Sequence, residues 1–140
     1  MMLESTRPTG ADAALLLARL LAGLLFLIFG VMKVSGFSAT VAGMSAGGVP
    51  LPMLAAIIAV VIELPLAILL MLGFATRPLA LVFAVYTVAT AVLGHPYWAV
   101  PADQWLNMLT HFYKNLAIAG GFLALYVAGP GRFSLDARRG

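Results

Sequence analysis

Three charged side chains stand inside long apolar runs of the sequence: Arg19, Glu63 and Lys114. A charge at the centre of a bilayer costs about 2.5–3.5 kcal/mol on insertion scales, so such residues usually pair with one another or serve a function. At a helical rise of about 1.5 Å per residue, Glu63 lies about 18 Å, Lys114 about 14 Å and Arg19 about 21 Å from the outer membrane face. These depths predict one buried polar cluster near the midplane of the membrane.

Two cations against one carboxylate would leave an excess of positive charge in this predicted cluster. Such a pocket favours an anion, or a polar carbonyl group such as the head of a quinone. Arg19, Lys114 and the neighbouring Asn115 are therefore candidate ligand-binding residues, and Glu63 is the candidate proton carrier. In the alternative interpretation, Glu63 pairs with Arg19 or Lys114 only to hold helices together. The sequence leaves both interpretations open.

Two further ionisable residues, Lys33 and His95, lie near the ends of the apolar runs, where the side chain reaches the interface at lower cost. Lys33 joins the candidate binding residues. His95 stands directly before Pro96 and is a candidate proton-uptake group, because imidazole exchanges protons near neutral pH. Glu63 and His95 are thus the two candidate catalytic residues.

The overall composition indicates a membrane protein. The chain has 140 residues, of which 63% are hydrophobic and only 9% charged, whereas about a quarter of the residues of a soluble domain are charged. The length favours a single domain covering residues 1–140. The net charge is +3, but the basic residues are scattered, so we expect no nucleic-acid partner.

The residues that usually hold metals are almost absent. The chain has no cysteine, which excludes disulfides, thiolate catalysis, cysteine-ligated zinc and iron–sulfur clusters. No two histidine or carboxylate residues stand at helical i, i+3 or i, i+4 spacing, so the sequence predicts no metal site and no covalently bound cofactor. Electrons in any redox function would pass directly between organic or sulfur substrates, or arrive from a partner subunit.

Four apolar runs are long enough to cross a bilayer as helices of about 20 residues. They cover residues 13–34, 51–72, 78–95 and 105–127, and Gly- and Pro-containing breaks separate them. The sequence therefore predicts an all-α membrane protein, a bundle of four transmembrane helices. The mildly apolar loop 37–48 is expected to form a short interfacial or re-entrant segment.

Arginine residues predict the orientation of this bundle. If the N-terminus is cytoplasmic, five arginines lie on the cytoplasmic side, and loops 35–50 and 94–104 on the other side contain no Lys or Arg. The five cytoplasmic residues would be Arg7, Arg77, Arg132, Arg138 and Arg139. The positive-inside rule then places both termini in the cytoplasm.

One face of the first span combines charged and small residues: Arg19, Gly23, Phe26, Gly30 and Lys33 recur at helical spacing. Small residues let neighbouring helices approach closely in a membrane. We therefore assign this face to the interior of the bundle and expect both glycines to contact another helix.

A proline interrupts the second span two residues after Glu63. Pro65 has no backbone N–H, so the carbonyl of Val61 loses its helical partner and the helix is expected to kink. A freed carbonyl beside a buried carboxylate would add a polar group to the site.

Several short motifs, in their order and spacing, resemble those of the DoxX family of small bacterial membrane proteins. The matching segments are Ala18–Leu24 with Phe29-Gly30 and Lys33, Pro50-Leu51-Pro52 leading to Glu63, Thr76-Arg77-Pro78, His95, Lys114-Asn115-Leu116, and Gly129–Asp136. Family members resembling this chain are linked to a terminal quinol oxidase, to thiosulfate–quinone oxidoreductases, or to membrane oxidoreductase complexes that handle thiol and superoxide stress. The resemblance carries the family's polar pattern onto the same candidate residues, Arg19, Lys33, Glu63, His95 and Lys114.

The resemblance implies a protein of the bacterial inner membrane. It favours a quinone-linked redox subunit that binds a quinone or a small anionic substrate, either beside oxidoreductase partner subunits or as a homo-oligomer. A permease for small anions or solutes is a second hypothesis, which requires a loose or oligomeric bundle. A non-catalytic assembly subunit of an oxidoreductase complex is the third. In each case the lipid bilayer is the surrounding medium.

Overall fold

A computed structural model describes residues 7–139 of the chain, and this part is helical without any strand. The main helices are α1 (Ala11–Ser35), α2 (Phe37–Ala46), α3 (Pro52–Val61), α4 (Ala67–Leu72), α5 (Thr76–Gly94) and α6 (Ala102–Ala128). Short helical turns add η1 (Ile62–Leu66), η2 (Tyr97–Ala99) and η3 (Asp136–Arg138). The predicted all-α fold class is confirmed.

Within residues 7–139, three helical segments are apolar and long enough to cross a membrane: Ala11–Ser35, Pro52–Leu72 and Thr76–Ala99. The second is one helix built from α3, η1 and α4. These segments coincide with the first three predicted spans, with ends shifted by a few residues. α6 is 27 residues long, but its first half is more polar, and it does not reach the same apolarity.

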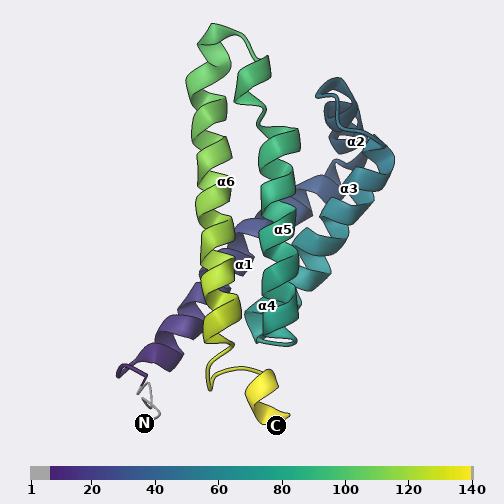
Figure 1. The fold of residues 1–140 in the computed structure, drawn as a ribbon. Coiled ribbons are helices and arrows are strands. Elements are labelled where there is room, and N and C mark those ends of the chain that lie inside the picture. The colour runs from purple at the N-terminus through teal and green to yellow at the C-terminus, as the bar shows by residue number, and fades with distance from the viewer. Residues whose placement is uncertain (1–6, 140) are drawn as a thin grey trace.

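The helices form two groups that converge at one end (Figure 1). α1 packs against α3, η1 and α4, whereas α5 runs antiparallel to α6 and contacts it along its length. A cluster of aromatic rings joins the two groups: Phe83 lies 4.9 Å from Phe26 and 5.1 Å from Phe122 between ring centroids. This buried cluster also contains Leu70 and Leu125 and forms the apolar core.

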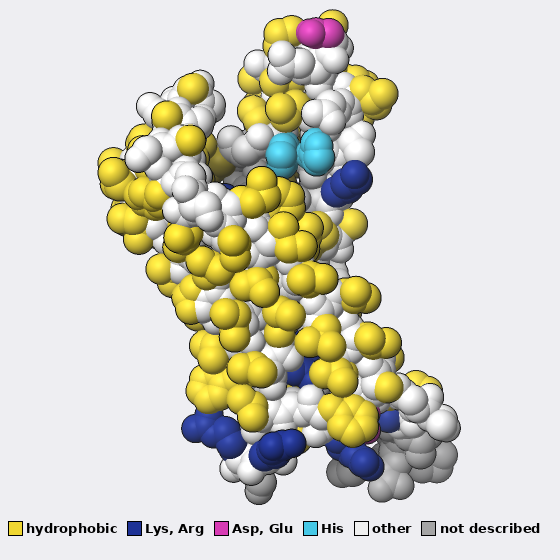
Figure 2. Space-filling model, turned by 180° about the vertical axis from the view of Figure 1, so that it is seen from behind, with side chains coloured by type: hydrophobic (Ala, Val, Ile, Leu, Met, Phe, Trp, Pro, Cys, Tyr) yellow, Lys and Arg dark blue, Asp and Glu magenta, His cyan; other side chains and the backbone are white. Residues whose placement is uncertain are grey.

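The two ends of the molecule differ in composition. The described ends of the chain lie at the same end of the molecule (Figure 1). We call it the arginine end, because five arginines stand on the segments that meet there: Arg7, Arg77, Arg132, Arg138 and Arg139. The opposite end, here the histidine end (His95, His111), is hollowed between the arm of α2 and α3 and the arm of α5 and α6 (Figure 2). The middle of the visible surface is largely hydrophobic, as contact with lipid requires.

The segment expected to be interfacial is a helix. α2 occupies the predicted loop 37–48, and it packs against α3 at the histidine end. It is too short to cross a bilayer.

The glycine face of α1 points to the second span, as predicted. A Cβ atom on Gly30 would lie 2.8 Å from the carbonyl carbon and oxygen of Glu63, and one on Gly23 would overlap the side chain of Met71. Phe26 lies between them and is also buried. Only glycine therefore lets α1 approach the second span this closely.

Candidate functional site

Glu63 lies at the centre of the molecule, on the π-helical turn η1, and is only 4% exposed. Its Oε2 accepts a hydrogen bond from the Lys33 ammonium at 2.7 Å, and its Oε1 accepts one from the Tyr86 hydroxyl at 2.5 Å. These distances are typical of charge-assisted hydrogen bonds. Three helices thus converge on one carboxylate, and we call these three residues the Glu63 triad.

The π-helical turn has a local cause in the sequence. Pro65 inside η1 cannot donate to the carbonyl of Val61, so the regular hydrogen-bond pattern is interrupted there. The predicted kink takes the form of a widened turn, a feature that often occurs at functional sites. Gly30 of α1 lies directly against this turn, so glycine and proline together bring Lys33 and Glu63 into contact.

Arg19 does not join Glu63, so the predicted cluster of three charges is wrong. The Arg19 guanidinium is completely buried at the arginine end and donates to the carbonyls of Met71, at 2.9 Å, and of Phe133. Arg19 and Lys33 are separated by fourteen residues, about 21 Å along α1. Because Gly30 packs against Glu63, the cation that reaches the carboxylate is the one three residues further along, Lys33.

Lys114 also lies apart from Glu63. Its residue is exposed on α6, and within residues 7–139 no carboxylate oxygen lies within 4.0 Å of its ammonium. It follows the ring cluster of Phe112 and Tyr113, which contacts Tyr97 on η2. Such rings mark membrane interfaces, so Lys114 reaches polar surroundings without a buried partner.

The remaining predicted residues, Asn115 and His95, lie on the side of the Glu63 triad that faces the histidine end. Asn115 donates from Nδ2 to Thr90 Oγ1 at 3.2 Å, which joins α6 to α5. His95, at the end of α5, stacks on His111 of α6 with ring centroids 5.0 Å apart and an interplanar angle of 22°. His95 Nδ1 is buried and has no hydrogen-bond partner in the described residues.

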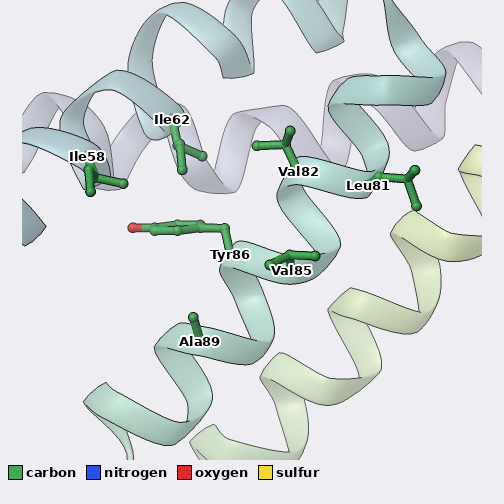
Figure 3. A pocket seen from close by; sticks show the side chains of 7 residues that line it. All are labelled: Ile58, Ile62, Leu81, Val82, Val85, Tyr86 and Ala89. Atoms are coloured by element: carbon green, nitrogen blue, oxygen red, sulfur yellow. The ribbon is translucent and has the colours of Figure 1, made fainter.

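Sequence reasoning missed Tyr86, the residue that completes the Glu63 triad. A detectable signal was present, because a tyrosine in the middle of an apolar span must find a partner for its hydroxyl group. Tyr86 also lines a groove of about 470 Å³ between the second span and α5 (Figure 3). The other lining residues are all aliphatic: Ile58, Ile62, Leu81, Val82, Val85 and Ala89.

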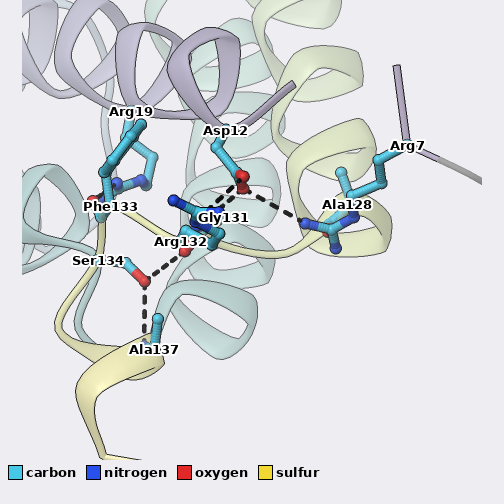
Figure 4. A network of polar contacts seen from close by, with 9 residues as sticks. All are labelled: Arg7, Asp12, Arg19, Ala128, Gly131, Arg132, Phe133, Ser134 and Ala137. Atoms are coloured by element: carbon cyan, nitrogen blue, oxygen red, sulfur yellow. Dashed lines mark hydrogen bonds and ion pairs between the residues drawn. The ribbon is translucent and has the colours of Figure 1, made fainter. Parts of the chain in front are cut away.

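The arginine end is held together by polar contacts. Arg19 touches the turn after α4, where Gly73 has φ +72° and a Cβ atom would overlap the guanidinium. Asp12 accepts the backbone N–H of Arg132 at 2.9 Å and lies within 4 Å of the Arg7 and Arg132 side chains (Figure 4). α1 and the C-terminal segment are thereby joined.

Asp136 closes the same end by capping α5. Its two carboxylate oxygens accept the backbone N–H groups of Ala75 and Thr76 at 2.8 and 2.9 Å, groups that have no partner inside the helix. Burial raises the pKa of this carboxyl, but the hydrogen bonds from Thr76 and Ala75 and the charge of Arg139 outweigh it, so the pKa lies below its usual value. Asp136 is therefore ionised at neutral pH.

No three His, Asp or Glu side chains come together as metal ligands within residues 7–139. The chemistry available at the Glu63 triad is proton transfer and hydrogen bonding. A carboxylate, an ammonium and a phenol share one site beside an apolar groove.

Comparison with known proteins decides the family. The sequence model of the DoxX family matches residues 14–96, which include Arg19, Lys33, Glu63, Tyr86 and His95. The chain belongs to the DoxX family. The matched region contains the complete Glu63 triad, whereas Asn115 and the cap Asp136 lie beyond it.

Two curated relatives in Escherichia coli strain K12 indicate the cellular location of this DoxX-family chain. Inner membrane protein YphA is 54% identical over 124 residues, covering 89% of each chain. Inner membrane protein YqjF is 40% identical over 125 residues, covering 89% of this chain and 91% of the relative. No solved structure matches the chain. Like these relatives, the protein is an inner membrane protein.

Proposed function

We propose that the protein is a quinone-linked redox subunit that binds a quinone in the groove between the second span and α5. The observation that carries this proposal is the position of Tyr86. Its ring lines an aliphatic groove of about 470 Å³, and its hydroxyl group is bound to the buried carboxylate of Glu63. A quinone fits this arrangement, because its apolar tail suits the aliphatic side chains of the groove and its ring oxygens need a proton donor such as the Tyr86 hydroxyl group.

The Glu63 triad supplies the protons that such a reaction needs. Reduction of a quinone to a quinol takes up two electrons and two protons. Each of the two protons would pass from a protonated Glu63 to the Tyr86 oxygen while the Tyr86 hydroxyl donates its own proton to a reduced ring oxygen. The Lys33 ammonium would stabilise the Glu63 carboxylate left after each transfer, and Glu63 would take up a new proton from the aqueous side before the next one. The two electrons would come from the redox group of a partner oxidoreductase subunit.

The same proposal includes the orientation in the membrane. We infer that α6 is a fourth span and that the arginine end faces the cytoplasm. The five arginines at one end, and the lack of Lys or Arg in loops 35–50 and 94–104, support this orientation. Reporter fusions after Pro101 and at the C-terminus should report periplasm and cytoplasm, respectively. Two fusions on the same side would contradict a fourth span.

Filling the groove tests the binding of quinone. Val85 lines the groove and is 70% exposed, whereas Val88 lies one turn further along α5, is also exposed, and does not line it. Val85→Trp should abolish the quinone that copurifies with the protein in native-lipid discs, and Val88→Trp should retain it. The quinone content is measured by solvent extraction and mass spectrometry.

The result separates the three functional hypotheses. Quinone bound to the wild type and lost in Val85→Trp alone supports the proposal. Equal loss in both variants, or no quinone in the wild type, contradicts it. Anion flux into liposomes with no bound quinone would favour a permease, and loss of a partner complex without any bound ligand would favour an assembly subunit.

A further inference from the structure

We propose that Glu63 exchanges its proton with the histidine end of the protein, along a track of polar side chains between α5 and α6. This inference rests on the proposed function, because it assigns a direction to the proton supply of the same site. Its test reads the protonation of Glu63 itself and requires no quinone.

The track begins at the Glu63 triad. Tyr86 touches Glu63 directly, and Thr90 follows Tyr86 by four residues on the same face of α5. Thr90 Oγ1 accepts a hydrogen bond from Asn115 of α6 at 3.2 Å. The polar groups therefore advance from the buried carboxylate by one helical turn toward the histidine end.

The histidine pair completes the track. His111 precedes Asn115 by four residues on the same face of α6, and His95 stacks on His111 from the end of α5. Two charged imidazole rings at a centroid distance of 5.0 Å would repel each other, so the pair is suited to carry a single proton. The other titratable groups near the pair are Tyr97, Tyr113 and Lys114, while the described residues place no carboxylate within 4.0 Å of it.

The surface geometry agrees with this direction. The histidine side chains appear on the face shown in Figure 2, beside the hollow between the two arms of the molecule. Lys33 lies near the end of α1 that is closer to the histidine end. Its side chain is 23% exposed whereas that of Glu63 is only 6% exposed, so Lys33 is the more accessible of the two. The two hydrogen-bond partners of Glu63, Lys33 and Tyr86, thus connect the carboxylate to the side of the molecule that carries the histidine end.

The opposite direction is closed by the apolar core. Between Glu63 and the arginine end, the two helix groups meet at the packed rings of Phe26, Phe83 and Phe122, with Leu70 and Leu125. Phe83 is completely buried, and Phe122 is 2% exposed. Proton transfer needs hydrogen-bonding groups, which these aromatic and aliphatic side chains do not supply.

Labelling with dicyclohexylcarbodiimide tests the direction of exchange. The reagent crosses membranes and adds to a protonated carboxyl group: the O–H adds across one C=N bond, and the acyl group then moves to nitrogen, so nothing leaves. Membrane vesicles of both orientations are labelled while the pH is varied on one side only, and the adduct on Glu63 is quantified by mass spectrometry. Glu63→Gln identifies the signal, because it removes the labelled group.

We expect the labelling rate of Glu63 to increase by up to about tenfold for each unit by which the pH at the histidine end is lowered. Changing the pH at the arginine end should leave the rate unchanged. Labelling that follows the arginine end would overturn the proposal. A labelling rate that depends on the pH of neither side, or the absence of an adduct on Glu63 at any pH, would also overturn the proposal.

Blocking the track provides the second measurement. The double variant Thr90→Val with Asn115→Leu should slow the labelling of Glu63 several-fold at the same pH. Thr110→Val is the matched control, because this exposed threonine of α6 bonds only to the Leu106 carbonyl of its own helix. Both variants are first compared with the wild type in detergent melting. Unchanged labelling in a folded double variant would contradict the track, whereas the quinone measurement can fail without affecting this result.

Discussion

Glu63→Gln should destabilise the protein far more than its nearly unchanged size suggests. The substitution removes the anion that Lys33 and Tyr86 contact at 2.7 and 2.5 Å, and leaves the Lys33 ammonium without a counter-charge near the centre of the bundle. Breaking a buried ion pair costs about 3–5 kcal/mol. We expect a clearly lower melting temperature in detergent, measured by the loss of helical circular dichroism.

The identity of the rescuing substitution tests which cation is the partner. Adding Lys33→Met to Glu63→Gln should recover part of the lost stability, because it removes the unpaired charge. Adding Lys114→Met should recover none, since Lys114 is exposed on α6 and lies apart from the carboxylate. Equal rescue by both, or rescue by Lys114→Met alone, would show that the carboxylate has a different partner.

Gly30→Leu should be the most damaging substitution on α1. A Cβ atom at this position would lie 2.8 Å from the Glu63 carbonyl carbon and oxygen, and backbone atoms cannot turn aside as a flexible side chain does. Overpacking of a core typically costs about 1–3 kcal/mol, and we expect at least the upper end of this range. The variant should give little folded protein and a lower melting temperature in detergent.

Leucine substitutions at two further glycines serve as comparisons for the stability loss of Gly30→Leu. Gly23→Leu should cost less, because its new side chain meets mainly the flexible side chain of Met71. Gly120→Leu should cost little, since a Cβ atom on Gly120 meets no atom within 4 Å. If Gly30→Leu melts like Gly120→Leu, α1 does not pack against the π-helical turn as described.

The sequence alone determined the medium, the class and the main helices of this protein. A hydrophobic fraction of 63% requires a lipid environment. Because a backbone in lipid must satisfy its own hydrogen bonds, long apolar runs form helices there. The glycine face of α1 was also predictable, because helical periodicity is a local property. The kink at Pro65 follows from the missing N–H of a single residue.

The partners of the charges were not predictable in the same way. Depth along straight helices placed Arg19, Glu63 and Lys114 at one level, but α1 is about 38 Å long and runs obliquely across the bundle (Figure 1). Its tilt changes which residue reaches Glu63, and the close contact at Gly30 selects Lys33. Sequence spacing contains no information on such a crossing.

The tertiary structure also assigned roles to residues that carry no local signal. Asp136 caps α5 from sixty residues away, and Arg19 binds a carbonyl at the end of α4 and one in the C-terminal segment instead of a carboxylate. Unpaired backbone groups at helix ends need polar partners wherever the chain can supply them. Hydropathy and periodicity determine which segments are helices, whereas the packing of those helices decides which buried charge meets which partner.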